Sequence, residues 1–142
     1  MLIDYDMPLW RPPSEADSFI LQATLGCSFN RCSFCSMYRT KSFVIRPLAQ
    51  VQAEIQAMSR LDPAPRRVFL ADGDALAAPT GHLLEILGAL KAALPGLERV
   101  ASYALPANLL KKSADELRCL RDNGLTLLYY GIETGAAELL KR

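Results

Sequence analysis

The chain has 142 residues, of which 51% are hydrophobic, with 16 lysines and arginines against 15 aspartates and glutamates. That length suffices for one ordinary hydrophobic core, and a formal net charge of +1 gives no general attraction for nucleic acid. No segment approaches the roughly 18 consecutive apolar residues of a membrane span, and residues 1–6 include two aspartates where a signal peptide is basic. We therefore expect a cytoplasmic protein that engages neither membrane nor nucleic acid.

The N-terminal part of the chain predicts an arm followed by a domain. Residues 1–17 contain three prolines and predict an irregular N-terminal arm, so the domain is expected over residues 18–142. The apolar, β-rich run at residues 18–25 predicts the first strand.

A first helix is predicted to begin at Pro47, because proline at the first helical position loses no hydrogen bond. Apolar residues then recur at steps of three and four, which is the spacing of one buried helical face: Leu48, Val51, Ile55 and Met58. Pro63 and Pro65 prevent its continuation. A basic run precedes this helix, and we expect solvated loop charges rather than a phosphate or acidic-substrate contact: Arg39, Lys41 and Arg46.

The middle of the chain repeats the alternation of strand and helix. Residues 67–71 predict a second strand, Thr80 is the expected cap of a second helix, and residues 97–104 predict a third strand. The second helix carries an apolar face and stops at the dipeptide of residues 95–96: Leu83, Leu84, Leu87, Leu90 and Leu94.

The last third predicts one further unit. Ser113 and Glu116 have the spacing of a capping box for a third helix, and residues 123–124 (Asn-Gly) supply its stop signal. Residues 125–132 predict a fourth strand, and Thr134 is a candidate hydroxyl cap for another helix.

Strands that alternate with helices predict an α/β fold with a parallel sheet and right-handed crossovers. The near-continuous apolar strands agree with a sheet covered on both faces. A complete TIM-type (β/α) barrel needs about 250 residues, so we expect a partial βα barrel, truncated after about four units, in a fragment of a longer protein. The fourth strand would then be an open apolar edge. The alternative is a complete small open α/β sheet.

The most informative segment is a loop with three cysteines directly after the first strand and Gly26. Cys27, Cys32 and Cys35 have the spacing Cys-x4-Cys-x2-Cys. Thiolates this close in sequence can meet at one soft metal centre, as in iron–sulfur proteins. Clustered cysteines without a secretory signal bind metal more often than they form disulfides.

Polar residues stand at the expected carboxyl ends of the later strands, which build the site in parallel α/β folds. They follow the second, third and fourth strands in turn: Asp72, Gly73 and Asp74; Ser102, Tyr103 and Asn108; Glu133 and Thr134. As alternatives, Asp72 and Asp74 could be turn residues around Gly73, and Glu133 could stabilise a helix N-terminus.

With this loop and these strand ends, the chain from about Ser18 to its last residue resembles the N-terminal half of a radical S-adenosylmethionine (radical SAM) enzyme. The resemblance implies a 4Fe-4S cluster held by three cysteines, with one iron free to bind the amino and carboxylate groups of S-adenosylmethionine: Cys27, Cys32 and Cys35. It also implies cofactor-binding residues for the adenine, the methionine moiety and the ribose, respectively: Phe34; Gly73 and Asp74; and Glu133.

Two features differ from the commonest family pattern. The usual loop is Cys-x3-Cys-x2-Cys, so the present loop has one extra residue between its first two cysteines. The usual Gly-Gly-Glu segment is here Asp72-Gly73-Asp74, in which the second carboxylate is shorter and reaches less far.

The resemblance further implies an enzyme that reductively cleaves S-adenosylmethionine to a 5′-deoxyadenosyl radical, which abstracts hydrogen from a substrate. The substrate, whether a small molecule or a macromolecule, is not identified, and no catalytic residue is assigned beyond the cluster site. An external reductant such as flavodoxin or ferredoxin would supply the electron.

Other readings of the cysteines remain. The same spacing with a distant fourth cysteine occurs in plant-type 2Fe-2S ferredoxins, but Cys119 is expected about 9 Å down a helix, as a small buried hydrophobe. Structural zinc needs four ligands, and His82 is expected at the surface. The alternative function is an iron–sulfur electron-transfer protein or a metal-stabilised interaction module without catalysis.

Overall fold

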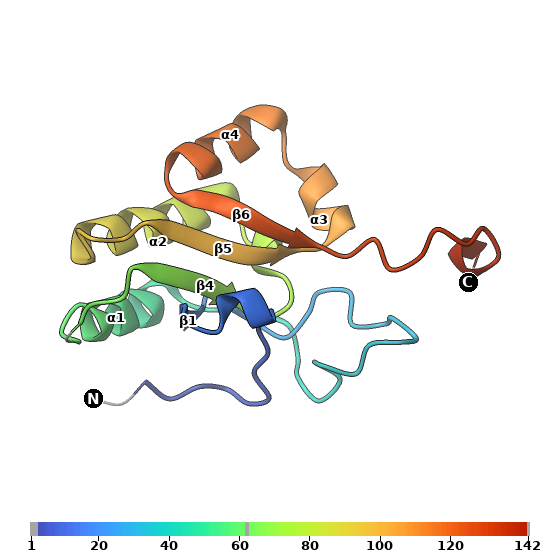
Figure 1. Cartoon of the computed structure of the whole chain (residues 1–142), viewed down its shortest axis with the longest axis horizontal. Helices are drawn as coiled ribbons and strands as arrows, with labels where there is room; N and C mark the ends of the chain where they lie inside the picture. Colours follow the sequence, from blue (N-terminus) through green and yellow to red (C-terminus); the bar gives the residue numbers. More distant parts are fainter. Residues whose placement is uncertain (1–2, 62, 142) are drawn as a thin grey trace.

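The computed structural model describes residues 3–61 and 63–141. Its centre is a four-stranded sheet in the order β1-β4-β5-β6, in which every neighbouring pair is parallel (Figure 1). The strands are β1 (Phe19–Gln22), β4 (Arg67–Ala71), β5 (Arg99–Ala104) and β6 (Leu125–Tyr130). The sheet is not closed within the described residues, so the chain has the predicted α/β fold of a partial βα barrel.

Helices lie between consecutive strands of this sheet. They are α1 (Leu48–Met58), α2 (Thr80–Ala93), α3 (Pro106–Lys111) and α4 (Ala114–Asp122). The sequence did not predict α3, which is a short helix that begins at a proline. No helix among the described residues is long and apolar enough to cross a membrane.

The main core lies between the sheet and the helices. Alternate strand residues face the helices, because successive side chains of a strand point to opposite faces. The fully buried members from the strands are Leu21, Val68, Leu70 and Val100, and those from the helices include Ile55, Met58, Leu87, Leu90 and Leu120. This burial confirms the predicted apolar faces of the first two helices.

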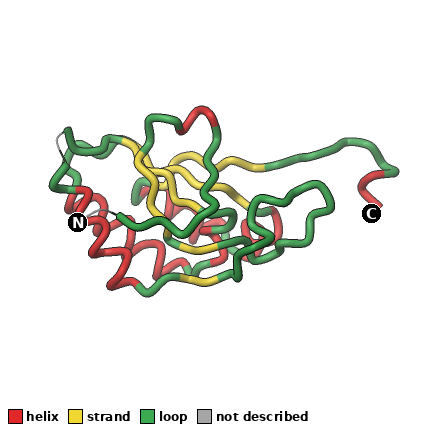
Figure 2. The backbone as a smooth tube through the Cα atoms, turned by 90° about the horizontal axis from the view of Figure 1, so that it is seen from below, coloured by secondary structure: helices red, strands yellow, loops and turns green. Residues whose placement is uncertain are grey.

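The later part of the N-terminal arm packs on the other face of the sheet, and its 3-10 turn lies opposite the helices in Figure 2. Here Phe69 packs edge-to-face against Tyr103 and Tyr129, with ring centroids 5.1 and 6.2 Å away. Leu9 of the arm packs against this smaller cluster. The arm is irregular apart from one 3-10 turn, η1 (Pro13–Glu15), but it forms a layer of the fold.

Glu15 fastens the arm to the sheet. Its side chain is fully buried, and Oε1 accepts hydrogen bonds from Arg99 Nη2 at 2.6 Å and from the Tyr129 hydroxyl at 2.5 Å. The Ser18 hydroxyl donates to Oε2. A buried carboxylate needs such partners, because an unpaired charge in the interior is costly.

The predicted first strand over residues 18–25 is in fact two strands. β1 pairs with β4 as far as Gln22, after which the chain turns away and forms β2 (Thr24–Leu25), antiparallel to β3 (Val44–Ile45). The carbonyl of Ala23, at the break, accepts from Arg46 N at 3.1 Å. An apolar run alone cannot reveal this break, since both pieces are extended.

The predicted capping of helices has two outcomes. Ser113 and Glu116 form the capping box at the start of α4, as predicted. Thr80 does not cap α2: the residue before the helix is Pro79, and the Thr80 hydroxyl donates to Glu116 Oε1 at 2.9 Å. The Thr80 hydroxyl therefore makes a tertiary contact with α4 in place of the predicted capping hydrogen bond within its own helix.

The end of the chain differs from prediction. The structure shows no α-helix over residues 131–141, and this segment extends away from the sheet (Figure 1). It ends in a single 3-10 turn, η3 (Leu139–Lys141). The Thr134 hydroxyl accepts from Ala136 N at 3.0 Å, which is a local turn contact.

Candidate functional site

The three-cysteine loop begins where β2 ends and extends beyond the carboxyl ends of the parallel strands (Figure 1). Gly26 starts it with a φ of 71°, a left-handed conformation that favours glycine. Cys27, Cys32 and Cys35 are free thiols of intermediate burial. We call the end of the sheet where β4 and β5 finish the carboxyl edge, and the loop adjoins it.

The surroundings of the Cys32 thiol disfavour its ionisation. Burial raises the pKa of the Cys32 thiol, and the charges of Cys35, Cys27 and Glu133 raise it further, while Arg39 lowers it. Several anionic groups therefore lie close enough to oppose the ionisation of Cys32. A bound cationic centre would relieve this repulsion.

Asp72 contacts the start of the cysteine loop and is fully buried. Its Oδ2 accepts from Gly26 N at 2.8 Å and forms an ion pair with Lys41 Nζ at 2.8 Å. Its Oδ1 accepts from Gln22 Nε2 at 3.2 Å. The Asp72 carboxylate, which the sequence predicted at the carboxyl edge, thus links β1, the start of the cysteine loop and the segment after the loop.

Asp74 is also fully buried. Its oxygens accept from Ser28 N at 3.3 Å, from the Ser28 hydroxyl and from Asn108 Nδ2 at 2.7 and 2.8 Å. Burial raises the pKa of this carboxyl, and the hydrogen bonds from Ser28 and Asn108 oppose that rise. The structure gives Asp74 contacts inside the protein, and its predicted contact with methionine stays a prediction.

Gly73, between the two aspartates, allows a close approach to the loop. A Cβ at this position would lie 2.7 Å from Cε2 of Tyr38 and 3.3 Å from Cβ of Cys27. Its N–H also donates to the Gly26 carbonyl at 3.2 Å. The strand end and the loop therefore touch through a residue without a side chain.

Tyr38 is the buried aromatic residue of the loop region, with 4% of its surface exposed. Its hydroxyl is buried and has no hydrogen-bond partner among the described residues. Burial and then the Asp72 charge raise its pKa, with further contributions from Tyr103, Cys27 and Cys35. An orphaned hydroxyl beside cysteines is what a site for a sulfur-containing cluster would contain, because cluster sulfurs accept hydrogen bonds.

The donor set also fits an iron–sulfur cluster, because three thiols on one loop are soft ligands. Among the described residues, no group of three histidine, cysteine or acidic side chains is already placed to hold a metal ion. Metal sites are commonly completed by the metal itself, so the thiols would have to converge when a cluster binds.

The remaining predicted residues differ in burial, since Phe34 and Glu133 are exposed and Ser102 is buried. The Phe34 side chain is 66% exposed on the loop, and Glu133 has a φ of 64° on the extended C-terminal segment. At the end of β5, the Ser102 hydroxyl donates to the Tyr103 carbonyl at 2.9 Å. The geometry thus joins the cysteine loop most closely to Asp72, Gly73, Asp74 and Asn108.

Several residues of this region have contacts that the sequence did not predict. The basic run was expected to be solvated, but Lys41 is 9% exposed and paired with Asp72. Arg46 forms an ion pair with Glu54 at 2.6 Å, and Arg39 Nε donates to the Cys35 carbonyl at 3.1 Å. The expectation of solvated charges is therefore wrong for Lys41 and Arg46, whereas Arg39 is exposed as expected.

Of the two rival ligands, Cys119 lies away from the loop. Cys119 is exposed, in contrast to the predicted buried position, because the charged side of α4 faces outward. It stands in the last turn of α4, toward the strand starts, whereas the cysteine loop lies beyond the strand ends. His82 is partly buried rather than exposed, and its Nε2 has no partner among the described residues.

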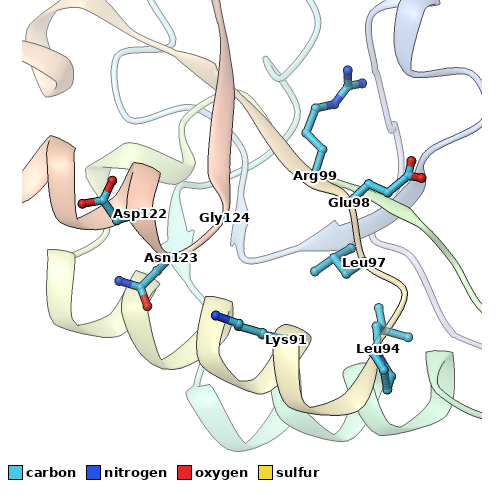
Figure 3. A pocket seen from close by; sticks show the side chains of 9 residues that line it. Lys91, Leu94, Leu97, Glu98, Arg99, Asp122, Asn123 and Gly124 are labelled. Atoms are coloured by element: carbon cyan, nitrogen blue, oxygen red, sulfur yellow. The ribbon is translucent and has the colours of Figure 1, made fainter.

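A shallow cavity lies at the opposite end of the sheet from the cysteine loop (Figure 3). It lies where α2 ends, β5 begins and α4 turns into β6, and its lining includes Lys91, Leu94, Asp122 and Asn123. It contains none of the predicted site residues, and Arg99 points away from Lys91 in this view.

Comparison with known proteins identifies the family of this chain. The chain matches the family described as the Radical SAM superfamily over residues 21–142. Neither the curated proteins nor the solved structures include a significant match. Because the family match covers most of the chain, this protein belongs to the radical SAM superfamily, as the cysteine loop and strand ends indicated.

Proposed function

We propose that this protein holds a 4Fe-4S cluster through Cys27, Cys32 and Cys35 and uses it to cleave S-adenosylmethionine reductively. Family membership supports the class of chemistry. The observation that carries the proposal is the position of the three thiols, on one loop that adjoins the carboxyl edge of a parallel sheet. Three thiolate ligands leave one iron of a 4Fe-4S cluster without a protein ligand.

A cluster held by these thiols would, once reduced, supply the electron that breaks a carbon–sulfur bond of S-adenosylmethionine, and the cleavage would give the 5′-deoxyadenosyl radical and methionine. The protein binds, orients and shields. The exposed ring of Phe34 is free to cover the adenine. The Gly73–Asp74 turn, which adjoins the loop, would hold the methionine moiety, and Glu133 is the candidate for the ribose. The radical would abstract hydrogen from a substrate that remains to be identified, with flavodoxin or ferredoxin as the type of reductant.

Anaerobic reconstitution with iron and sulfide tests this proposal. We expect about four irons per chain, and dithionite with S-adenosylmethionine should then release 5′-deoxyadenosine and methionine. Replacing any one of Cys27, Cys32 and Cys35 by serine should abolish the cleavage. The measurements are iron content and chromatography of the products.

Cys119→Ala is the matched control, because this thiol is exposed on α4 and away from the loop. It should leave iron content and cleavage unchanged. Loss of iron in this variant would favour a four-cysteine electron carrier. A loaded protein that holds iron but releases no 5′-deoxyadenosine would contradict the proposed activity.

A further inference from the structure

Both chain neighbours of Cys27 are held by carboxylates at the end of β4. Before Cys27, Gly26 N donates to Asp72 Oδ2 at 2.8 Å, and after it, Ser28 N donates to Asp74 Oδ2 at 3.3 Å. We propose that Asp72 and Asp74 form a clamp that fixes Cys27 in place, so that they are positioning residues for this thiol. The clamp is defined by these two aspartates.

The Asp72 side of the clamp is anchored deep in the fold. The carboxylate is paired with Lys41 Nζ, whose side chain is 4% exposed, and it also accepts from the almost fully buried Gln22. Lys41 in turn donates to the Asp6 carbonyl at 2.5 Å. With little water to compete for these groups, the Asp72 carboxylate has one favourable position, and Gly26 is held there.

The Asp74 side is anchored by α3. Asn108 Nδ2 donates to both oxygens of Asp74 and to the Ser28 hydroxyl at 3.0 Å. The Ser28 hydroxyl itself donates to Asp74. Three elements far apart in sequence therefore meet at the residue after Cys27, although neither α3 nor Ser28 belongs to the family motif.

Cys32 and Cys35 are held differently. Cys35 N donates to the Cys32 carbonyl at 3.3 Å, and Arg39 donates to the carbonyls of both cysteines. These contacts stay within the loop and are exposed, so they do not fasten the two cysteines to the sheet. The contrast gives Cys27 a preset position and leaves the other two thiols free to close on a metal centre.

Alkylation of the metal-free protein, followed residue by residue with mass spectrometry under anaerobic conditions, tests the clamp. Asp74→Asn keeps the size of the side chain but replaces one acceptor oxygen with an NH2 group. That group would face the NH2 group of Asn108, so one hydrogen bond between the two side chains is lost. We expect the alkylation rate of Cys27 to rise about tenfold, because hydrogen bonds to a charged acceptor are lost. The rates of Cys32 and Cys35 should stay unchanged.

Asp115→Asn is the control, since Asp115 is an exposed acid on α4, and it should alter none of the rates. Asn108→Ala is a second variant that removes the anchor of Asp74 and leaves Asp74 itself in place; it should give the same selective rise. Circular dichroism reports whether each variant is folded. If the Cys27 rate is unchanged, or if all three loop cysteines react faster together in both variants, the clamp is overturned.

The effect of the clamp on cluster loading rests on the proposed function, whereas the position of Cys27 does not. Reconstituted Asp74→Asn should bind less iron than the wild-type protein. A wild-type chain that binds no iron but shows the selective alkylation change would reject the proposed function and keep the clamp. Iron bound at equal levels, without any selective change at Cys27, would reject the clamp alone.

Discussion

Gly73 shows how much can depend on a missing side chain. The buried ring of Tyr38 occupies the space into which a Cβ atom at Gly73 would project. A flexible surface side chain could move away from an added methyl group, but a ring enclosed in the interior has little room to do so. The glycine that the family pattern assigns to cofactor binding is therefore also required by packing.

We expect Gly73→Ala to lower the free energy of unfolding by about 1–3 kcal/mol, the usual cost of overpacking. The new Cβ would lie 2.7 Å from Tyr38 Cε2. Urea unfolding of the metal-free protein measures the change.

Gly88→Ala is the matched control for this substitution. Gly88 lies inside α2, where an added Cβ meets nothing within 4 Å. It should raise the free energy of unfolding by about 0.5–1 kcal/mol, since alanine is the better helix former. Equal effects of the two substitutions would contradict the packing argument.

Helix α4 shows how one element is attached to its neighbours through its capping box. Glu116 accepts from Ser113 N at 2.8 Å and from the Thr80 hydroxyl at 2.9 Å. Lys112 Nζ donates to the Ala78 carbonyl at 2.9 Å and to the Thr80 hydroxyl at 3.2 Å. The start of α4 and the start of α2 are thereby joined, which extends a local capping motif into a tertiary contact.

This arrangement predicts a pH dependence. The hydrogen bond from the Ser113 backbone, and then that from Thr80, hold the pKa of Glu116 below its ordinary value of 4.5. A lowered pKa means that the folded state favours the carboxylate, so the contribution is present above about pH 4.5 and is lost as pH falls through the lower folded value.

The free energy of unfolding, measured from pH 6 to about pH 3, tests this expectation. The difference between the wild-type protein and Glu116→Gln should shrink as the pH falls, because glutamine does not titrate. A difference that is constant over this range would show that the ionised Glu116 contributes nothing.

The molecule as a whole consists of a sheet between two unequal layers. Helices cover one face and bury most of the core, whereas the later part of the N-terminal arm packs a few side chains against the other (Figure 2). Two acids of this arm pair with arginines at strand starts: buried Glu15 with Arg99, and exposed Asp17 with Arg67. Only the first pair is enclosed by the fold.

We expect Glu15→Ala to lower the free energy of unfolding by about 3–5 kcal/mol, because Arg99 would lose the partner of a largely buried charge. Asp17→Ala is the control and should cost less than about 1 kcal/mol, as its side chain is 88% exposed. Guanidinium unfolding of both variants measures the two values. Similar costs would mean that the arm does not depend on Glu15.

Local signals carried much of this structure. The run at residues 67–71 became β4 with the predicted bounds, and the Ser113–Glu116 spacing became a capping box, because each depends on neighbouring residues alone. The cysteine spacing likewise led to the family that the chain matches over residues 21–142. The contacts of the candidate site with cluster and cosubstrate remain predictions.

Contacts between segments far apart in the sequence could not be predicted from local signals. The burial of Lys41 depends on Asp72, that of Glu15 on Arg99, and the position of Ser28 on Asn108, 80 residues away. Composition and periodicity describe a residue's own segment, so they established the α/β alternation and the cysteine motif, and they predicted the kind of metal centre that the motif would bind. Packing alone decides which charges are buried and which thiol is held. Only in the folded chain do these partners meet and leave contact with water.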